Sequence, residues 1–244
     1  MDTYSTVVIV LVTFRRPNVA MTTIRGLKDN LEYPADKIGW HIADDGSGID
    51  YINKLANEIG PNYQISVSDA ARGGVGKSMN LGIEAALLRS DLWLHMEDDW
   101  NLVQKLDISS SVRLLVENDK VGMVRLNYLS TDVVGKVEGM SDELWWVLNR
   151  KCYHYTFSGG PSLRHRRFYE AYGAYEEGLG PGETEDNYCW KFNMSSGPAV
   201  VWPAWYPHRG YFRDIGGSSS FNKLHGNGIS ADEAADIFDR AGVS

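Results

Sequence analysis

The sequence predicts an α/β protein with a mostly parallel central sheet flanked by helices. Three observations lead to this class. Short β-branched apolar runs alternate with segments in which apolar residues recur at helical intervals. Acidic and glycine-rich turns follow the runs, as loops do at the carboxyl ends of parallel strands. With 244 residues and 43% hydrophobic content, the chain can bury one substantial core, so we expect a single domain over residues 1–244.

The first half repeats a strand, turn and helix pattern. Residues 7–14 (VVIVLVTF) form the first predicted strand, and Val19, Ile24 and Leu27 place a helix after the turn RRPN. The segment GWHIADDGSG begins a second unit, whose helix covers residues 49–59. A third unit runs from YQISVSD through a glycine loop into the helix KSMNLGIEAALLRS, and then into the strand LWLHM and the turn EDDW. This alternation predicts right-handed crossovers and parallel pairing.

The second half has weaker periodicity. LDISSSVRLLVEND predicts a helix and VGMVRLNYL a strand, whereas the stretch between Phe157 and Gly228 favours no single structure. Near the end, Ser230 and Glu233 have capping-box spacing in SADEAADIFDRAG, which predicts a C-terminal helix. The expected division of the chain is 1–101, 102–228 and 229–244.

Composition works against several classes of protein. The formal net charge of −8 does not suit a dedicated surface for nucleic acid or anionic membrane. Cys152 and Cys189 are too few for a disulfide framework and lack metal-ligand spacing, which favours a reducing compartment. The longest early apolar run, Val7 to Val12, is too short to span a bilayer. We therefore expect a cytoplasmic protein without stable membrane insertion, in an oligomeric state that the sequence leaves open.

The stretch AARGGVGKSMN resembles a phosphate-binding P-loop in its Gly-Lys-Ser ending. Walker A requires glycine five residues before that Gly-Lys pair, and Ala71 stands there. The loop also follows the third predicted strand rather than the first. A P-loop nucleotidase or kinase that uses Lys77 therefore stays one alternative, and a glycine turn that lets a helix pack close to the sheet is another.

The acidic and glycine loops all follow strands, so they should converge on one crevice at the carboxyl edge of the sheet. Carboxylates spaced i and i+2 after a strand suit a hard divalent cation such as Mn²⁺ or Mg²⁺, with phosphate oxygens as further ligands. The implied ligand is a metal-bound diphosphate. The residues expected in this crevice are Thr13, Arg15, Arg16, Asp44, Asp45, Arg72, Gly73, Lys77, Asn80, Glu97, Asp98 and Asp99.

The ordered motifs VVIVLVTFRRP, ADDGSG, GGVGKSMNLGIEAA, LHMEDDW and GETEDNYCWKF resemble the GT-A-fold nucleotide-sugar glycosyltransferases of the family-2 type. The resemblance implies a Rossmann-like GT-A fold, in which 1–101 binds the nucleotide sugar and 102–228 forms the acceptor-facing catalytic half. It implies a metal-dependent, inverting transferase that moves a sugar from a nucleoside-diphosphate sugar, with UDP favoured, to a hydroxyl acceptor. Glycan, protein, lipid and modified DNA base all stay open as the acceptor.

The resemblance also implies a metal site. The Asp-x-Asp motif of these enzymes matches Glu97-Asp98-Asp99, where the last acid binds Mn²⁺ or Mg²⁺ and the earlier acids approach the ribose and metal-bound water. The first acid here is Glu97 instead of aspartate. A late histidine serves as a third metal ligand in several such enzymes, which points to His208, with His225 as the competing candidate.

The same resemblance assigns the chemistry to a Glu-Asp pair at the head of a helix. Asp186 is the expected general base for the acceptor hydroxyl, and Glu185 is its neighbour. Gly159 and Gly160 are expected under the donor sugar. A noncatalytic nucleotide-sugar-binding module on the same fold is the remaining alternative.

Overall fold

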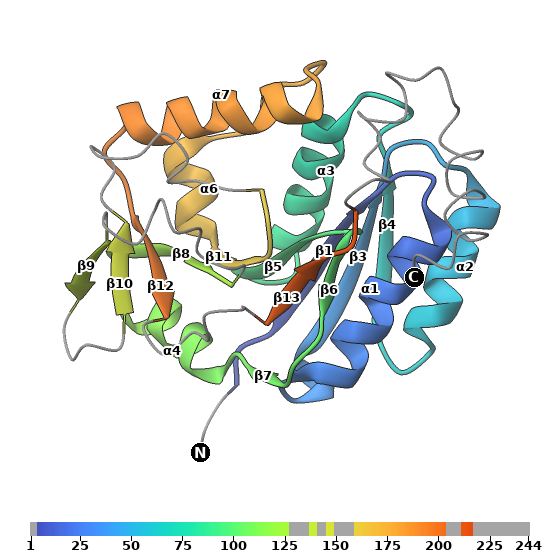
Figure 1. Cartoon of the computed structure of the whole chain (residues 1–244), viewed down its shortest axis with the longest axis horizontal. Helices are drawn as coiled ribbons and strands as arrows, with labels where there is room; N and C mark the ends of the chain where they lie inside the picture. Colours follow the sequence, from blue (N-terminus) through green and yellow to red (C-terminus); the bar gives the residue numbers. More distant parts are fainter. Residues whose placement is uncertain (1–3, 127–136, 141–144, 149–158, 204–210, 217–244) are drawn as a thin grey trace.

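The computed structural model describes residues 4–126, 137–140, 145–148, 159–203 and 211–216. Its main sheet has nine strands among these residues, in the order β4-β3-β1-β5-β11-β8-β12-β10-β9 (Figure 1). His208, His225 and the C-terminal helix expected at 229–244 lie outside the described residues. The sheet with flanking helices confirms the α/β class.

The first half contributes four strands that are parallel to one another. These are β1 (Val7–Thr13), β3 (Ile38–Asp44), β4 (Gln64–Asp69) and β5 (Leu92–Glu97). Every residue of β1 and β3 is buried, which explains their continuous apolar runs, since both faces of these strands are covered by helices. All four strands match the predicted ones.

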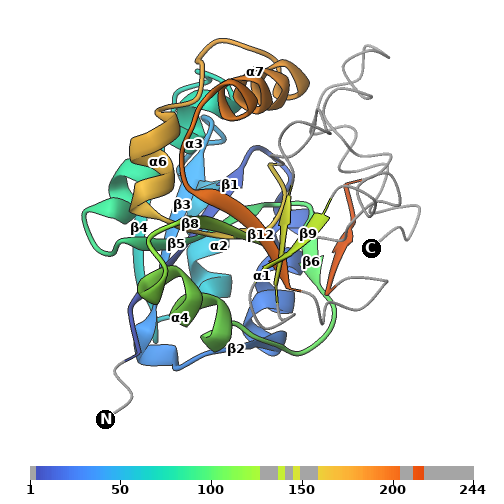
Figure 2. The same cartoon turned by 90° about the vertical axis from the view of Figure 1, so that its left-hand side faces the viewer.

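Two hydrophobic clusters pack on opposite faces of the sheet, because successive residues of a strand point to opposite sides. On one face, Val7, Ile9 and Leu11 pack with the apolar side chains of α1 (Pro17–Asn30) and α2 (Ile49–Ile59). On the other face, the intervening residues of β1 pack with the apolar side chains of three helices. These helices are α3 (Val75–Leu87), α6 (Arg166–Tyr172) and α7 (Pro181–Met194). Figures 1 and 2 both show α7 beside α3 and α6.

The second half extends the sheet with mixed pairing. β11 (Ser162–His165) is antiparallel to β5 and to β8 (Val121–Arg125), which follows α4 (Ser109–Glu117). β12 (Ala199–Pro203) is parallel to β8. β10 (Trp145–Leu148) is antiparallel to β12, and the edge strand β9 (Val137–Met140) is antiparallel to β10. The regular parallel pairing predicted from sequence is thus concentrated in the first half.

Short strands outside the main sheet were not predicted. β2 (Leu31–Glu32) pairs with β7 (Leu106–Asp107), and the 3-10 turn η1 (Ala35–Lys37) precedes β3. β6 (Trp100–Leu102) pairs in antiparallel fashion with β13 (Phe212–Asp214). This last pairing matters for the site, because it brings the late segment 211–216 beside the acidic turn after β5. None of the helices in the described segments has the length and apolar character to cross a bilayer.

Helix α3 packs close to the sheet through Gly82. A β-carbon at this position would lie 2.7 Å from Val10 Cγ1 and 2.9 Å from Ala43 Cβ, both on central strands. This close approach sets the position of α3 and of the glycine loop that precedes it.

Gly82→Ala is therefore expected to lower the free energy of unfolding by about 1–3 kcal/mol, since the added methyl group overpacks the interface between α3 and the sheet. Gly182→Ala is the matched control, because a β-carbon there meets no atom within 4 Å. Urea unfolding of both variants measures the difference. Equal stability of the two variants would contradict the packing role of Gly82.

Candidate active site

The loops that follow the parallel strands meet at one edge of the sheet. Backbone hydrogen bonds join the strand ends: Asp45 donates to the Thr13 carbonyl and Asp98 donates to the Val12 carbonyl, each at 3.1 Å. A cavity of about 440 Å³ opens between these loops. Its lining consists of Val12, Thr13, Phe14, Arg16, Asp45, Gly74, Val75, Ser78, Glu97, Asp98, Asp99, Leu179, Gly180 and Pro181. The predicted crevice therefore exists at the predicted edge.

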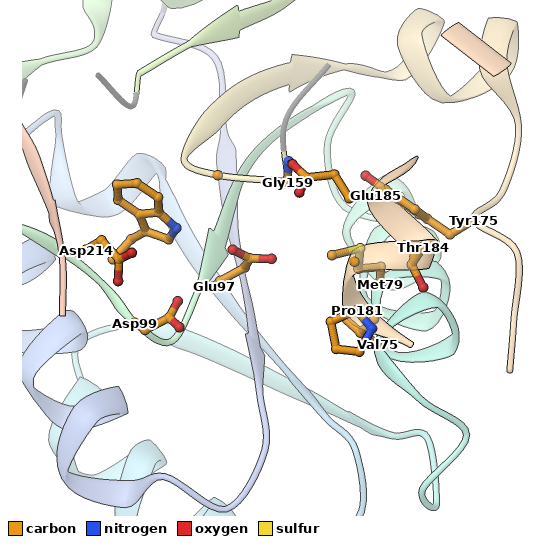
Figure 3. A pocket seen from close by; sticks show the side chains of 13 residues that line it. Val75, Met79, Glu97, Asp99, Gly159, Tyr175, Pro181, Thr184, Glu185 and Asp214 are labelled. Carbon is orange, nitrogen blue, oxygen red and sulfur yellow. The ribbon is translucent and has the colours of Figure 1, made fainter. Parts of the chain in front are cut away.

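A second cavity, of about 280 Å³, adjoins the first. Both are lined by Val75, Glu97, Asp99 and Pro181. In Figure 3, Asp99 and Asp214 lie on one side of this cavity and Glu185 lies on the other, with Glu97 between them. The remaining lining residues are Met79, Trp100, Gly159, Gly160, Tyr175, Gly182 and Thr184. The cavity thus lies between the two halves of the chain.

Among the acids that line the two cavities, Asp98 is the most enclosed, with 1% of its surface exposed. Its Oδ2 accepts hydrogen bonds from Thr13 Oγ1 at 2.8 Å and from the Phe14 backbone N–H at 3.3 Å, and Arg16 forms an ion pair with Oδ1. Burial raises the pKa of Asp98 to about 6, although the charge of Arg16 opposes the shift. Thr13 also shares a hydrogen bond with the buried hydroxyl of Tyr51. Asp98 therefore joins the end of β1 to the end of β5.

Asp99 is more accessible, with 18% of its side chain exposed. Its Oδ2 accepts a hydrogen bond from Arg16 Nη1 at 3.0 Å. The segment after β13 packs on it: Ile215 donates to the Asp99 carbonyl at 2.8 Å, and a β-carbon on Gly216 would lie 2.3 Å from Oδ2. This packing needs glycine at 216, and it brings Asp214 into the same cavity as Asp99.

Glu97 lies where the two cavities meet. Burial raises its pKa well above the ordinary range, and the nearby charges of Asp99 and Glu185 raise it further. Gly159 stands between the two glutamates, because a β-carbon there would lie 3.2 Å from Glu97 Oε1 and 3.8 Å from Glu185 Oε1. Carboxylates from the two halves of the chain therefore converge on one small space.

The Glu-Asp pair divides between cavity and solvent. Glu185 lines the smaller cavity, and its Oε1 accepts a hydrogen bond from the Gly159 backbone N–H at 2.7 Å. Asp186 is exposed and lines neither cavity, since consecutive residues of α7 point in different directions around the helix axis. Of the two acids named from sequence, the structure brings Glu185 to Glu97, while Asp186 faces away.

The Asp-Asp pair after β3 divides in a similar way. Asp44 is fully buried, and its carboxylate accepts hydrogen bonds from the Gly46 N–H at 3.0 Å and from the Ser47 N–H and hydroxyl, both at 2.6 Å. It builds the turn and lines neither cavity. Asp45 lines the larger cavity and accepts a hydrogen bond from the Gly74 N–H at 3.0 Å, and burial raises its pKa.

Five other expected ligand residues line neither cavity, namely Arg15, Arg72, Gly73, Lys77 and Asn80. Arg15 has a left-handed backbone, with φ of 51°, and its N–H donates to Ser47 Oγ at 2.8 Å. Arg72 is also left-handed, with φ of 62°, and is exposed. The stem of Lys77 packs on Gly73, where a β-carbon would lie 2.3 Å from Lys77 Cδ. The first four of these residues shape the two loops at the rim of the cavity.

Asn80 is buried and joins the two halves of the chain. Its Nδ2 donates to the Tyr175 carbonyl at 3.0 Å and to Glu177 Oε1 at 3.2 Å, and its Oδ1 accepts the Tyr175 N–H at 2.8 Å. Asn80 lines neither cavity, so it holds the segment that leads into α7 in place.

Sequence reasoning did not identify Tyr175 and Asp214 as site residues. Tyr175 lies in a stretch without clear periodicity, and the sequence does not distinguish a tyrosine that lines a site from one that packs in the core. Asp214 follows a strand of only three residues, β13, whose partner β6 lies far away in the chain. The Asp-x-Gly spacing of Asp214 and Gly216 after an aromatic residue is the one local signal of a turn there.

The acids at this edge could supply two carboxylate ligands to a hard divalent cation. Within the described segments, no three His, Cys, Asp or Glu side chains stand together in an arrangement that holds a metal ion. Mg²⁺ and similar ions, however, commonly take one or two carboxylates and complete their ligands with phosphate oxygens and water. Glu97 and Asp99, which line the same two cavities, fit such a pair.

The parallel half-sheet, the mixed extension and the acidic turn after β5 define the GT-A fold of nucleotide-sugar glycosyltransferases. No protein-family model matches the sequence, and no curated protein matches it. Solved structures with 13–17% sequence identity share the fold.

Three of these structures illustrate the similarity. The mannosyltransferase PcManGT from Pyrobaculum calidifontis, in complex with GDP-Man and Mn²⁺, has a TM-score of 0.59 and 17% identity over 86% of this chain and 59% of its own. TarS 1–349 from S. aureus has a TM-score of 0.56 and 13% identity over 81% of this chain and 60% of its own. GalNAc-T7 with UDP, GalNAc and Mn²⁺ has a TM-score of 0.58 and 13% identity over 84% of this chain and 43% of its own. This chain thus spans about three fifths of the first two proteins and less of the third.

Asn80→Ala is expected to lower the free energy of unfolding by about 1–3 kcal/mol, because it removes the buried hydrogen bonds that Asn80 makes with the Tyr175 carbonyl and N–H. The exposed Asn62→Ala is the matched control and is expected to stay within about 0.5 kcal/mol of the wild type. Urea unfolding measures both. A loss confined to Asn80→Ala supports its joining role, and equal stability of the two variants refutes it.

Proposed function

We propose that this chain is a metal-dependent, inverting glycosyltransferase that moves a sugar from a nucleoside-diphosphate sugar to a hydroxyl acceptor. The observation that carries the proposal is that Glu97 and Asp99 share one cavity with Glu185 from the other half of the chain. Acids on two sides suit a reaction in which a diphosphate leaves on one side and a hydroxyl attacks from the other. The GT-A fold supports the same class of reaction.

The larger cavity is the proposed donor site. Asp45 offers a carboxylate that can accept an N–H of a nucleobase, and Arg16 brings positive charge to the cavity. Val75 begins α3, so the amino end of a 13-residue helix, which favours negative charge, faces the space where we place the diphosphate. We favour a UDP-sugar. GDP-mannose is the second donor to test, since TarS has been solved with UDP-GlcNAc and PcManGT with GDP-Man.

Glu185 is the proposed general base. As the acceptor oxygen bonds to the anomeric carbon, the bond from that carbon to the diphosphate oxygen breaks, and the acceptor proton passes to Glu185. This single displacement inverts the anomeric centre. The Gly159 N–H holds Glu185 Oε1 at 2.7 Å and so orients the carboxylate. The resemblance favoured Asp186, but its exposed position supports Glu185 as the residue that meets the acceptor.

Asp99 and Glu97 are the proposed ligands of Mn²⁺ or Mg²⁺, which would supply positive charge to the leaving diphosphate when bound. Arg16 contributes positive charge at the same place, because it contacts both Asp98 and Asp99. His208 stays a prediction as a third ligand.

The two alternatives make different demands on the same chain. A P-loop enzyme needs Lys77 beside the phosphates, but Lys77 lines neither cavity. A noncatalytic nucleotide-sugar-binding module needs the larger cavity and has no use for Glu185 in the smaller one. The placement of Lys77 and Glu185 thus supports the transferase.

The acceptor, the oligomeric state and the cellular location are further parts of the proposal. The acceptor class stays open among glycan, protein, lipid and modified DNA base, and the oligomeric state stays open as well. We predict a cytoplasmic enzyme without stable membrane insertion.

Glu185→Gln is expected to lower sugar transfer by about 100-fold or more, because the amide cannot accept the acceptor proton. Donor binding should persist, since Glu185 does not line the larger cavity. The assay is UDP or GDP release from UDP-GlcNAc or GDP-mannose with Mn²⁺ and water as acceptor, together with isothermal titration of UDP. Asp186→Asn discriminates between the two acids. A much larger loss of sugar transfer in Asp186→Asn than in Glu185→Gln would show that Asp186 is the general base.

Arg16→Met is expected to bind Mn²⁺ about tenfold more tightly without nucleotide, an effect of ~1.4 kcal/mol, because Asp99 no longer pairs with a guanidinium. UDP binding should weaken, since a positive charge leaves the donor cavity. Electron paramagnetic resonance of free Mn²⁺ measures the first effect. Arg16→Lys keeps the charge and is the matched control, so equal Mn²⁺ affinities of the two variants would show that Arg16 does not compete for Asp99.

A further inference from the structure

A buried arginine lies behind the smaller cavity. Arg164 is on β11, with 1% of its surface exposed, and its guanidinium is 5.8 Å from the centre of the Phe168 ring. A buried guanidinium is costly unless its donors are well placed, so its hydrogen bonds indicate what it holds in position. Two of these bonds lead toward Glu185 by separate routes.

The first route runs through Gly159 and Gly160, which line the smaller cavity and form its glycine floor. Arg164 Nε donates to Ser162 Oγ at 2.9 Å, and Ser162 Oγ donates to the Gly160 carbonyl at 3.1 Å. The adjoining Gly159 N–H donates to Glu185 Oε1 at 2.7 Å. Ser162 has no exposed surface, so this chain of bonds is shielded from water. Arg164 therefore constrains the loop whose N–H orients the proposed base.

The second route runs through Tyr175. Arg164 Nη1 donates to the Tyr175 hydroxyl oxygen at 2.7 Å, which leaves the hydroxyl hydrogen to point elsewhere. Tyr175 lines the smaller cavity, and its ring stacks on Tyr188 of α7 with the ring centres 4.2 Å apart. In Figure 3 the Tyr175 side chain extends toward Glu185. The second route therefore reaches the wall of the cavity that carries Glu185.

The charge of Arg164 acts on two neighbouring titratable side chains, His95 and Tyr175. Burial and the charge of Arg164 hold the pKa of the neighbouring His95 well below its ordinary range, so His95 is neutral. Arg164 also acts on Tyr175, where its charge opposes the rise in the pKa of the phenol that burial causes. The phenol stays protonated, and it keeps both the oxygen that accepts from Arg164 and a hydrogen to donate.

We propose that Arg164 is a positioning residue that holds the Gly159–Gly160 floor and the Tyr175 hydroxyl together around Glu185. The inference rests on the proposed function for the role of Glu185, but the hydrogen-bond network that it describes is testable without turnover. A planar guanidinium serves this purpose because its donors diverge in fixed directions toward both Ser162 and Tyr175. A lysine ammonium retains the charge but cannot reproduce the forked geometry.

The first measurement is hydrogen exchange of the backbone amides of Gly159, Gly160, Ser162 and Leu163 in the wild type, Arg164→Met and Arg164→Lys. Arg164→Met has comparable length and removes every donor, and Arg164→Lys retains the charge without the forked donor geometry. We expect about tenfold faster exchange in Arg164→Met, because the floor opens locally. Arg166→Met is the matched control, since Arg166 is more exposed and pairs with Asp91 away from the cavity. Unchanged exchange in Arg164→Met would overturn the proposal.

The second measurement separates positioning from general destabilisation. We expect the kcat for donor hydrolysis to fall about 10- to 100-fold in Arg164→Met at an unchanged donor KM, as small misplacement of a catalytic group commonly produces. Tyr175→Phe should give a smaller loss, and the double variant should lose less than the product of the two single losses, since both act on Glu185. A rise in donor KM without a fall in kcat would overturn the positioning role.

The two proposals fail in different ways. If Glu185→Gln hydrolyses donor normally, the assignment of the base is wrong, and hydrogen exchange still decides whether Arg164 holds the floor. If Glu185→Gln is inactive while Arg164→Met matches the wild type in kcat and in amide exchange, the proposed function stands and the role of Arg164 is wrong.

Discussion

The buried carboxylate of Asp98 is the constraint on which the rest of the site depends. Its side chain is held by Thr13, the Phe14 N–H and Arg16, and its backbone carbonyl accepts a hydrogen bond from Thr23 of α1 at 2.7 Å. A charge so deeply buried is tolerated only with such partners. Because Asp98 cannot turn, its neighbours Glu97 and Asp99 have fixed directions into the cavity.

The partners of Asp98 also explain why the first loop is built as it is. Thr13 ends β1, and Arg16 immediately precedes α1, so one loop supplies both a neutral donor and a counter-charge. Among the described residues, the non-glycine positions with left-handed backbone are Arg15, Ala71 and Arg72, all in loops at the rim of the cavity. Strained backbone of this kind persists where surrounding contacts hold it, and here it brings the loops against the acids.

The second half completes the site by returning to strands that the first half has already formed. β11 lies between β5 and β8, and Gly159, which precedes it, lies against Glu97. β13 pairs with β6 and places Gly216 against Asp99. Glu97 consequently lies among three carboxylates, and its raised pKa reflects that crowding together with burial. Repulsion of this kind costs stability and favours a cationic or hydrogen-bonding ligand in the cavity.

The sequence by itself determined the strands and helices of the first half and the edge at which a site forms, since burial on both sheet faces leaves long apolar runs and parallel strands collect their loops at one end. It also predicted Thr13, Arg16, Asp45 and the acidic turn at Glu97 at this edge, where they line the larger cavity. Only the tertiary structure decided which member of each acidic pair faces the cavity, because that depends on the local backbone direction. The Asp44 carboxylate accepts hydrogen bonds within its own turn, and Asp186 is exposed. The tertiary structure also decided the places of Tyr175, Arg164 and Asp214, since their partners lie far away in the chain and leave no periodic pattern in the sequence.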